Sequence, residues 1–324
     1  MKKFIRNILV LIIANVMAVE AVSLAYVKLD REDSDYTNKF AYIPDKLQIC
    51  NFGSSHGLYG YNYEDISHKS DCFNFALVSQ TLSYDYRLFQ NYRHHIDKGT
   101  VVFITISYFS LFGIPEINTD GFVSKNKRYY SILPDDLIKE YDLLTDLFVH
   151  YFPALSVDFF SLVKTLLGRS SDFNDENWQE TALQADAAAD AKAAYERHIV
   201  NNKYDDAGNR IVNEEEIMAL YDLIEGCKEK GAIPILITTP YLREYTLEAE
   251  KNADGFFDGF YSVIRQVTAD TGVEYYDYAF DKRFSDKYSW FMDSDHLNKE
   301  GARNFTDILM QEIVYHKGYA KAKG

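Results

Sequence analysis

The chain has 324 residues, with 34 Lys or Arg against 49 Asp or Glu, so its formal net charge at pH 7 is −15. This charge excludes a protein that binds nucleic acid through a basic surface. Hydrophobic residues make up 47% and charged residues 26%, with 6 Pro and 16 Gly, which excludes a disordered or collagen-like chain. Three cysteines, Cys50, Cys72 and Cys227, are too few for a disulfide scaffold. We expect Cys50 and Cys72 to be buried thiols, with a Cys50–Cys72 disulfide as the alternative.

The N-terminus has the pattern of an export or anchor signal. Lys2, Lys3 and Arg6 precede an apolar run over residues 8–27, which as a helix would reach about 30 Å and span a bilayer. The cations would stay in the cytoplasm and the remainder would lie outside. A cleaved signal peptide, favoured by Glu20, stays open, as does a buried soluble helix. We expect residues 1–27 to anchor the chain in the cell membrane, or to direct its secretion if they are cleaved.

After a polar stalk over residues 28–42, residues 43–324 are predicted to form one α/β domain. Short apolar runs alternate there with helical patterns, which is typical of a mainly parallel sheet between helices. The expected strands are residues 47–52, 71–76, 100–106, 233–239 and 273–278. The expected helices are residues 82–96, 134–148, 214–230, 247–271 and 299–316. The sequence therefore predicts a three-layer α/β/α sandwich around a five-stranded sheet.

About 125 residues separate the third and fourth expected strands, which is too long for a plain crossover. We interpret residues 110–230 as an inserted helical cap. Within it, residues 171–216 carry twelve acids and four bases. Such a stretch is typical of a solvated surface of helix and loop, and a lid or partner-docking surface is the alternative.

The first candidate site follows the first expected strand, at residues 51–57 (Asn-Phe-Gly-Ser-Ser-His-Gly). Ser55 would lie at a strand-to-helix turn on the carboxyl edge of the sheet, where parallel sheets bind ligands. Glycines on either side allow a close approach to the backbone. Taken alone, the segment is more typical of a simple turn or helix cap than of a functional site.

The second candidate site precedes the last expected helix. Asp293 stands three residues before His296 in a loop, so its carboxylate can bind imidazole Nδ1 while Nε2 points elsewhere. Asp295 is the reserve for Asp293, because only spacing separates them. The same aspartates could form an Asp-x-Asp cation site, but hard cations need several convergent carboxylates, so we expect no metal.

Taken together, Gly53-Ser54-Ser55 and the Asp-x-x-His of residues 293–296 resemble blocks I and V of the SGNH/GDSL hydrolase family. Residues 74–81 resemble block II, with Ala76 and Ser79 in place of its two glycines, and residues 237–241 look like the family's fourth strand and its exit. The Gly-Ser-Ser form is similar to extracytoplasmic members that accompany acylation of cell-envelope polymers. Examples are the D-alanyl-lipoteichoic acid biosynthesis esterase and alginate or peptidoglycan O-acetyltransferases, which are commonly tethered by an N-terminal helix.

The resemblance implies a serine acyl-transfer site without a metal or organic cofactor. Ser55 would be the nucleophile, His296 the general base and Asp293 the residue that orients it. Backbone N–H groups of Ser55 and Ser79 would bind the oxyanion. The implied substrate is an acylated cell-envelope polysaccharide or teichoic acid, or a small ester. A multi-pass membrane acyltransferase is a possible partner, and no nucleic acid is implied.

One departure from the family concerns block III, where an Asn side chain is expected to donate to the oxyanion. This chain reads Thr-Ile-Ser-Tyr-Phe-Ser at residues 105–110, so Ser107 and Tyr108 are the candidate replacements. Loss of one such donor costs about 10² to 10³ in rate when nothing replaces it.

His56 is either a turn residue or a substrate contact. The alternatives to an esterase or O-acyltransferase are therefore a secreted carbohydrate O-deacetylase and a catalytically silent scaffold that docks a membrane acyltransferase.

Overall fold

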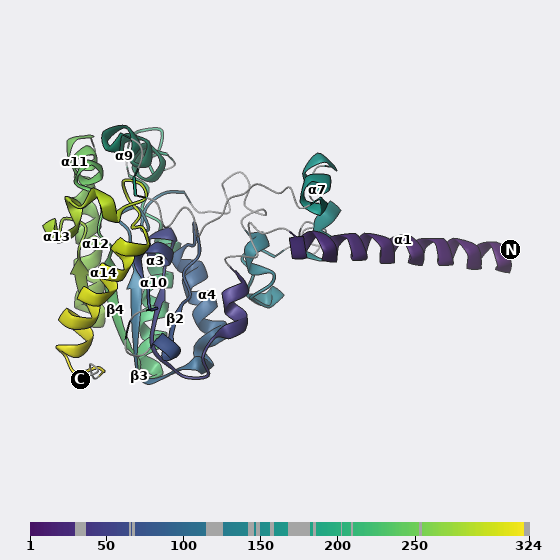
Figure 1. The fold of residues 1–324 in the computed structure, drawn as a ribbon, viewed down its shortest axis with the longest axis horizontal. Helices are drawn as coiled ribbons and strands as arrows, with labels where there is room; N and C mark the ends of the chain where they lie inside the picture. The colour runs from purple at the N-terminus through teal and green to yellow at the C-terminus, as the bar shows by residue number, and fades with distance from the viewer. Residues whose placement is uncertain are drawn as a thin grey trace. The chain divides into compact units, whose positions relative to one another are not determined.

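The computed structural model divides the chain into two compact units, and each is described here by itself (Figure 1). The first contains Met1–Tyr42 and Glu116–Phe173, and the second contains Ile43–Pro115 and Asn174–Gly324. The structure describes residues 1–29, 37–64, 66, 69–114, 126–141, 146, 150–155, 159–167, 182–183, 186–201, 203–208, 210–252 and 255–320.

The first unit is dominated by helix α1 (Lys2–Leu29). Its segment Lys2–Tyr26, with a mean hydropathy of 2.4, is long and apolar enough to cross a membrane, and a signal sequence would meet the same criteria. The described residues of this unit also form helix α7 (Phe159–Leu166) and the short 3₁₀ helices η1 (Asn38–Tyr42), η5 (Lys127–Tyr129), η6 (Asp135–Leu137) and η7 (Pro153–Leu155).

The helix expected over residues 134–148 is not continuous. Residues 135–137 form a 3₁₀ turn and Glu140 has a φ of 50°, in the left-handed region that an α-helix cannot pass through, whereas Asp146 is α-helical. Residues 142–145 and 147–149 of this prediction lie outside the described residues, as do residues 30–36 of the predicted stalk.

The second unit contains a sheet of five strands, all parallel, in the order β2-β1-β3-β4-β5. This confirms the predicted α/β class with a parallel five-stranded sheet. The chain leaves β1 toward β2 on one side and then continues from β3 outward on the other. Such a reversal of direction is where ligands bind in doubly wound sheets. The strands are β1 (Leu47–Phe52), β2 (Cys72–Asn74), β3 (Ile96–Thr105), β4 (Ile233–Thr238) and β5 (Glu274–Asp277).

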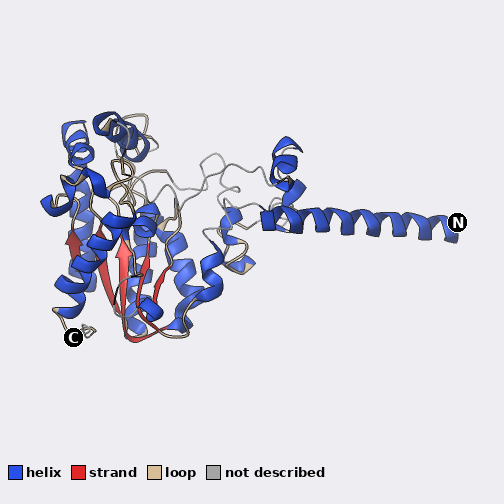
Figure 2. Cartoon of the chain, in the orientation of Figure 1, coloured by secondary structure: helices blue, strands red, loops and turns tan. Residues whose placement is uncertain are grey.

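Helices cover both faces of this sheet (Figure 2). Side chains alternate along each strand, so Ile49, Phe103 and Ile237 share one face, where they pack in a core with Phe305 and Leu309 of α14 (Lys299–Leu309).

On the other face Phe52 contacts Phe89 of α4 (Leu82–Tyr92), with ring centroids 6.4 Å apart. Helix α4 packs on α10 (Glu214–Glu229), which in turn contacts α12 (Phe256–Thr271). The parallel strands are therefore enclosed, and their carboxyl ends are left to carry the site.

The remaining helices of this unit are short. They are α3 (Ser55–Gly60), α9 (Ala187–Tyr195), α11 (Arg243–Asn252) and α13 (Lys282–Ser285), the 3₁₀ helices η2 (Lys69–Asp71), η3 (Arg93–His95) and η9 (Tyr288–Trp290), and the π-helical segments η8 (Glu196–Val200) and η10 (Met310–Tyr315).

Several boundaries differ from the predictions. The helix expected over residues 82–96 ends at Tyr92, and β3 begins at Ile96 because that residue pairs with Leu47 of β1. The helix expected over residues 247–271 is divided by Gly255, whose φ of 66° ends the α-helical geometry. Helix α10, at the end of the expected insertion, contacts both α4 and β4.

All three cysteines are free and buried. The Cys50–Cys72 disulfide alternative is wrong for a geometric reason. Cys72 pairs with Ile49, so the Cys50 and Cys72 side chains point to opposite faces of the sheet.

Candidate active site

Ser55 lies where the sequence predicted, at the carboxyl end of β1 and the first residue of α3. Its Oγ is 2.8 Å from Nε2 of His296, although 241 residues separate the two in the chain. Ser54, its neighbour, instead faces Nδ1 of His56, at 3.5 Å. The structure therefore distinguishes the two serines of the Gly-Ser-Ser turn, and only Ser55 is paired with His296.

His296 is held in place by Asp293. The Nδ1 atom of His296 is 2.8 Å from Asp293 Oδ2, while Asp293 Oδ1 accepts the backbone N–H groups of Asp295 at 3.0 Å and His296 at 2.7 Å. These bonds use both oxygens of one carboxylate to fix the loop and the imidazole together. A continuous hydrogen-bonded set, Ser55–His296–Asp293, results.

The turn that carries Ser55 is stabilised by hydrogen bonds to buried polar groups. Asp85 Oδ1 accepts the Gly53 N–H at 2.9 Å and the Gln80 amide at 2.5 Å, and the same amide reaches Gly53 O at 3.2 Å. Gly53 has a φ of 143°, and a Cβ there would lie 2.7 Å from Cβ of Thr105. Glycine is therefore required at this position both for the backbone conformation and for close packing on β3.

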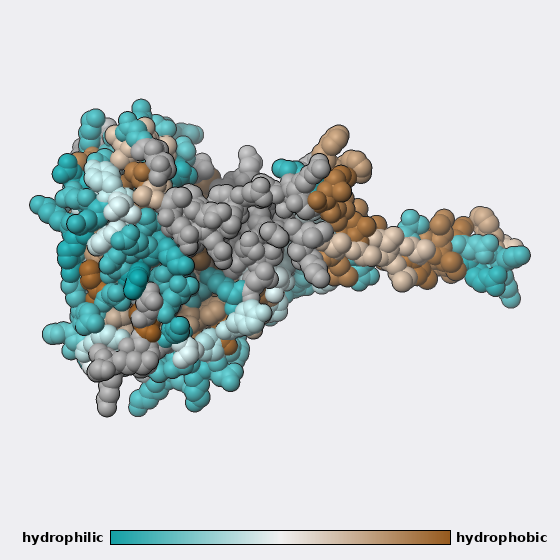
Figure 3. Space-filling model, viewed as in Figure 1, coloured by the Kyte–Doolittle hydropathy of each residue, from teal (hydrophilic) through white to brown (hydrophobic). Residues whose placement is uncertain are grey.

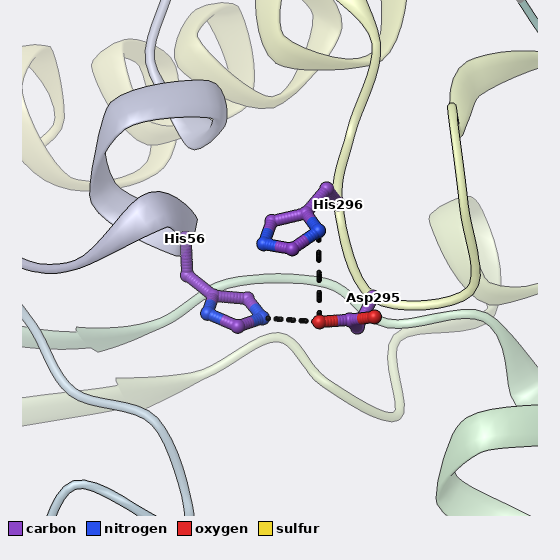
Figure 4. A group of neighbouring side chains, drawn as sticks. All are labelled: His56, Asp295 and His296. Carbon is purple, nitrogen blue, oxygen red and sulfur yellow. Dashed lines mark hydrogen bonds and ion pairs between the residues drawn. The ribbon is translucent and has the colours of Figure 1, made fainter. Parts of the chain in front are cut away.

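Asp295 is not the partner of the His296–Ser55 pair, but it lies directly beside it. Its fully buried carboxylate is 3.1 Å from Nε2 of His56 and 3.6 Å from Nδ1 of His296 (Figure 4). The imidazoles of His56 and His296 are stacked, with ring centroids 4.6 Å apart. A second carboxylate–imidazole pair, Asp295–His56, therefore lies against the first.

The inserted segment completes this cluster. His198 Nδ1, from η8, lies 3.5 Å from Asp295 Oδ2, and its ring stacks on Phe109 at 4.3 Å. Arg197 Nη2 lies 3.7 Å from Asp295 Oδ1. Asp190 of α9 accepts the backbone N–H of Ser294 at 2.7 Å. Cap residues thus contact the loop around His296 at three points.

The hydrogen bonds define one consistent set of imidazole tautomers. Arg197 Nε donates to His198 Nε2 at 3.2 Å, so the ring proton of His198 lies on Nδ1, toward Asp295. His56 directs Nε2–H to Asp295, and His296 directs Nδ1–H to Asp293, which leaves His296 Nε2 to accept the Ser55 proton.

These contacts shift the pKa values of the four groups in different directions. Burial lowers the pKa of His56, and it lowers that of His198 to about 3, so both are neutral at pH 7. Burial opposes charge on His296 as well, but Asp295 and Asp293 outweigh it and raise the pKa of His296 to about 9. Burial would also raise the pKa of Asp295, but the facing imidazoles hold it well below its usual range.

Among the residues that the structure describes, two groups of side chains have ligand atoms close enough to surround a cation. His56, Asp295 and His296 form one, and Asp190, Asp293 and Asp295 form the other. In the first group, Nδ1 of His296 already binds Asp293 and Nε2 of His56 already binds Asp295. Binding a metal there would remove His296 from its contact with Asp293, so the geometry fits a hydrogen-bonded network better than a metal centre.

The other predicted residues have contacts elsewhere. The Tyr108 hydroxyl donates to Asp277 at 2.9 Å and meets the Tyr261 hydroxyl at 3.1 Å, so it is directed to the end of β5. Ser107 is buried, and its backbone N–H donates to Ser110 Oγ at 3.1 Å. Ser79 is exposed in a turn, with a φ of 55°.

The candidate site is thus a hydrogen-bonded Ser–His–Asp set at the carboxyl edge of a parallel α/β sheet. No protein-family model matches the chain, and no curated protein matches it.

The sequence analysis missed Arg197, His198 and Asp190. The only feature of the sequence that could have suggested them is their location in the insertion between the third and fourth strands.

Asp85 provides a test of the support beneath the Ser55 turn. Burial raises the pKa of Asp85 to about 8, despite the hydrogen bonds from Gln80 and Gly53 that favour its charged form. The folded state therefore holds this proton to higher pH than the unfolded chain, and stability falls as pH rises from about 4 to about 8.

We expect Asp85→Asn, whose Oδ1 can still accept both hydrogen bonds, to remove up to about 1.4 kcal/mol per pH unit of this decline. Urea unfolding at pH 5 and pH 8 would measure the difference between the variant and the wild type. Asp222→Asn, on the exposed side of α10, is the control. Equal pH dependence in Asp85→Asn and the wild type would contradict the prediction.

Asp295 provides a test of the charge around His296. A carboxylate 3.6 Å from an imidazole favours its protonated form, and a single nearby charge shifts a pKa by about 1 to 3 units. In Asp295→Asn we therefore expect the pKa of His296 to fall by at least about one unit. The measurement is an NMR titration of the histidine ring resonances, with His296→Gln to assign the signal.

The matched control is Asp190→Asn, which removes a carboxylate bound to the same loop through the Ser294 backbone. It should move the His296 titration less than Asp295→Asn does. An unchanged titration in Asp295→Asn would show that the Asp295 carboxylate does not act on His296.

Proposed function

We propose that this protein is an extracytoplasmic serine esterase or O-acyltransferase of the SGNH/GDSL type. The observation that carries the proposal is the unbroken chain of contacts from Ser55 Oγ through His296 to Asp293, with both links at 2.8 Å. Such a geometry activates a serine hydroxyl as a nucleophile, because the carboxylate fixes the imidazole with Nε2 toward the hydroxyl. The position at the end of β1, where the strand order reverses, also supports it.

The proposed reaction is a two-step acyl transfer. Ser55 Oγ bonds to the ester carbonyl carbon while its proton passes to His296 Nε2. When the tetrahedral intermediate collapses, the ester C–O bond breaks and His296 returns the proton to the leaving alkoxide. Water or an acceptor hydroxyl then attacks the acyl-enzyme by the same steps in reverse order.

The oxyanion would be bound by backbone donors. Ser55 is the first residue of α3, and N–H groups in the first turn of a helix have no acceptor within the helix. Ser79 stays a candidate for the second N–H donor. The hydrogen bonds of Tyr108 to Asp277 and Tyr261 argue against its hydroxyl as the replacement for the block III Asn, whereas the buried Ser107 hydroxyl stays a candidate.

The natural substrate is proposed to be an acyl ester of a cell-envelope polysaccharide or teichoic acid. The apolar N-terminal helix supports a location at the outer face of the cell membrane, where such polymers and a multi-pass membrane acyltransferase would be accessible. Arg197 is the one cation in contact with the described Asp295–histidine cluster, and its side chain is 58% exposed. A site in a chain of net charge −15 needs such a local cation to bind an anionic polymer.

The first test is reaction of the full chain, in detergent, with a fluorophosphonate probe and with p-nitrophenyl acetate. The assay is run at pH 9, since a pKa of about 9 leaves His296 largely protonated at neutral pH. We expect Ser55→Ala to abolish labelling. Asp293→Asn should lower hydrolysis by about 10⁴, the order of loss when the imidazole takes the wrong tautomer.

Ser54→Ala is the matched control, because Ser54 lies in the same turn and faces His56 instead of His296. It should keep most of the labelling. Labelling that survives Ser55→Ala would overturn the assignment of the nucleophile. A folded wild-type protein that neither reacts with the probe nor hydrolyses the ester would favour the silent scaffold, for which the missing block III Asn is the supporting observation.

A further inference from the structure

Helix α7 and the turn before it expose an unusual amount of apolar surface. Phe159 is 71% exposed, Phe160 83%, Leu155 55% and Leu167 64%. On the same helix, Thr165 is only 7% exposed. Of the polar side chains described on this helix, Thr165 is buried and Lys164 is exposed, while large apolar side chains at both ends face outward, which is unusual for a helix on a water-exposed protein surface.

This segment packs against the C-terminal part of α1. Both η7 and α7 contact α1, and the backbone N–H of Ala154 donates to Ser23 Oγ at 3.4 Å. Ser23 and Tyr26 are buried, whereas apolar residues from Phe4 to Leu24 are exposed along the rest of the helix. Figure 3 shows the apolar surface of α7 beside the apolar surface of α1. The two exposed surfaces are thus continuous.

The level of this contact along α1 can be worked out from the helix rise. From Lys3 to Ser23 is about 30 Å at 1.5 Å per residue, which equals the thickness of the hydrocarbon core. If Lys2, Lys3 and Arg6 lie at the inner headgroups, Ser23 lies at the outer boundary of the hydrocarbon. The segment that packs on Ser23 then lies at the outer interface.

The charge of the segment also fits lipid. In a chain of net charge −15, residues 151–169 contain one acid, Asp158, and two bases, Lys164 and Arg169. A short helix with aromatic residues on its outward face and no excess of acid is typical of segments that lie in the headgroup region of a bilayer.

We propose that α7 and the η7 turn form a second membrane contact, in which Leu155, Phe159, Phe160 and Leu167 enter the outer leaflet beside α1. The occupant of this surface is the lipid bilayer itself. The contact would limit tilting of the first unit relative to the membrane, because the unit would be held at α1 and at a second point beside it. The inference does not depend on the activity of Ser55.

The test uses the full chain in vesicles of phosphatidylcholine and phosphatidylglycerol, with no other protein present. A cysteine at Phe160→Cys carries a nitroxide label, and its collision rates with oxygen and with a water-soluble nickel chelate are compared by electron paramagnetic resonance. The three native cysteines are buried, so the new exposed thiol is the one labelled preferentially. Phe160 is 83% exposed, and among the described contacts its substitution removes the ring contact with Phe159.

Two control positions set the scale. Val10→Cys, 60% exposed on α1, reports the hydrocarbon core, and Met218→Cys, 65% exposed on α10, is an exposed apolar side chain of the second unit. We expect oxygen collisions to exceed nickel collisions at Val10 and Phe160, and the reverse at Met218.

A label at Phe160 that is as accessible to nickel as the label at Met218 would overturn the proposal. If the label at Val10 were then in lipid, a protein partner would be the remaining occupant of the α7 surface. If Val10 were also in water, α1 itself would not be a membrane span, and the proposal would fail with it.

Discussion

A buried negative charge organises the candidate site. The Asp295 side chain has no exposed surface, and moving an ionised carboxylate out of water costs on the order of several kcal/mol unless it is paired and hydrogen-bonded. His56, His198 and Arg197 supply that pairing. Nδ1 of His296 also lies 3.6 Å from this carboxylate, so His56 and His296 compensate its charge together with the two residues of η8. Packing of η8 on this loop is therefore one part of what offsets the cost of burying the carboxylate.

This charge also explains why two aspartates stand so close to one histidine. Asp293 fixes the direction of the His296 ring through a hydrogen bond, whereas Asp295 lies off that bond and acts through its charge. These two functions are separable in principle. Orienting the imidazole ring requires a hydrogen-bond acceptor, whereas stabilising its positive charge does not. Together the carboxylates favour the protonated imidazole, which is the form that His296 takes in the transition state of the proposed acyl transfer. Because the protonated form of His296 predominates at neutral pH, only a small fraction of the neutral imidazole is present to accept a proton. This small fraction opposes the gain in transition-state stabilisation.

The parts of the site that the sequence predicted are those set by local geometry. Ser55 follows a strand that any periodicity analysis finds, and the spacing of Asp293 and His296 already allows their hydrogen bond. Parallel strands bring their carboxyl ends to one edge, which places Ser55 there, whereas its pairing with His296 was predicted from the resemblance to the SGNH/GDSL family. The choice between Asp293 and Asp295 could not be made from spacing, because it depends on how the loop turns: Asp293 Oδ1 accepts the N–H groups that shape this turn.

What the sequence could not predict arises from long-range packing and from single backbone conformations. Arg197 and His198 reach Asp295 across about one hundred residues, and an acidic, Ala-rich insertion gives no sign of that contact. Similarly, Gly255 divides an expected helix because it takes a left-handed φ, and Glu140 interrupts another in the same way, although only the glycine could have been suspected.

Not all carboxylates of the acidic stretch over residues 171–216 lie on the solvated surface that the sequence predicted. Asp190 lies within that acidic stretch, yet its carboxylate accepts the Ser294 backbone N–H, one residue from Asp295. In the same stretch Glu216 accepts both the N–H and the hydroxyl of Ser83 at the start of α4, each at 2.9 Å. A share of the acidic residues therefore fastens the insertion and α10 to the sheet domain. The net charge of a sequence includes these structural carboxylates together with the solvated ones. The two kinds are distinguished only by their hydrogen-bond partners in the folded structure.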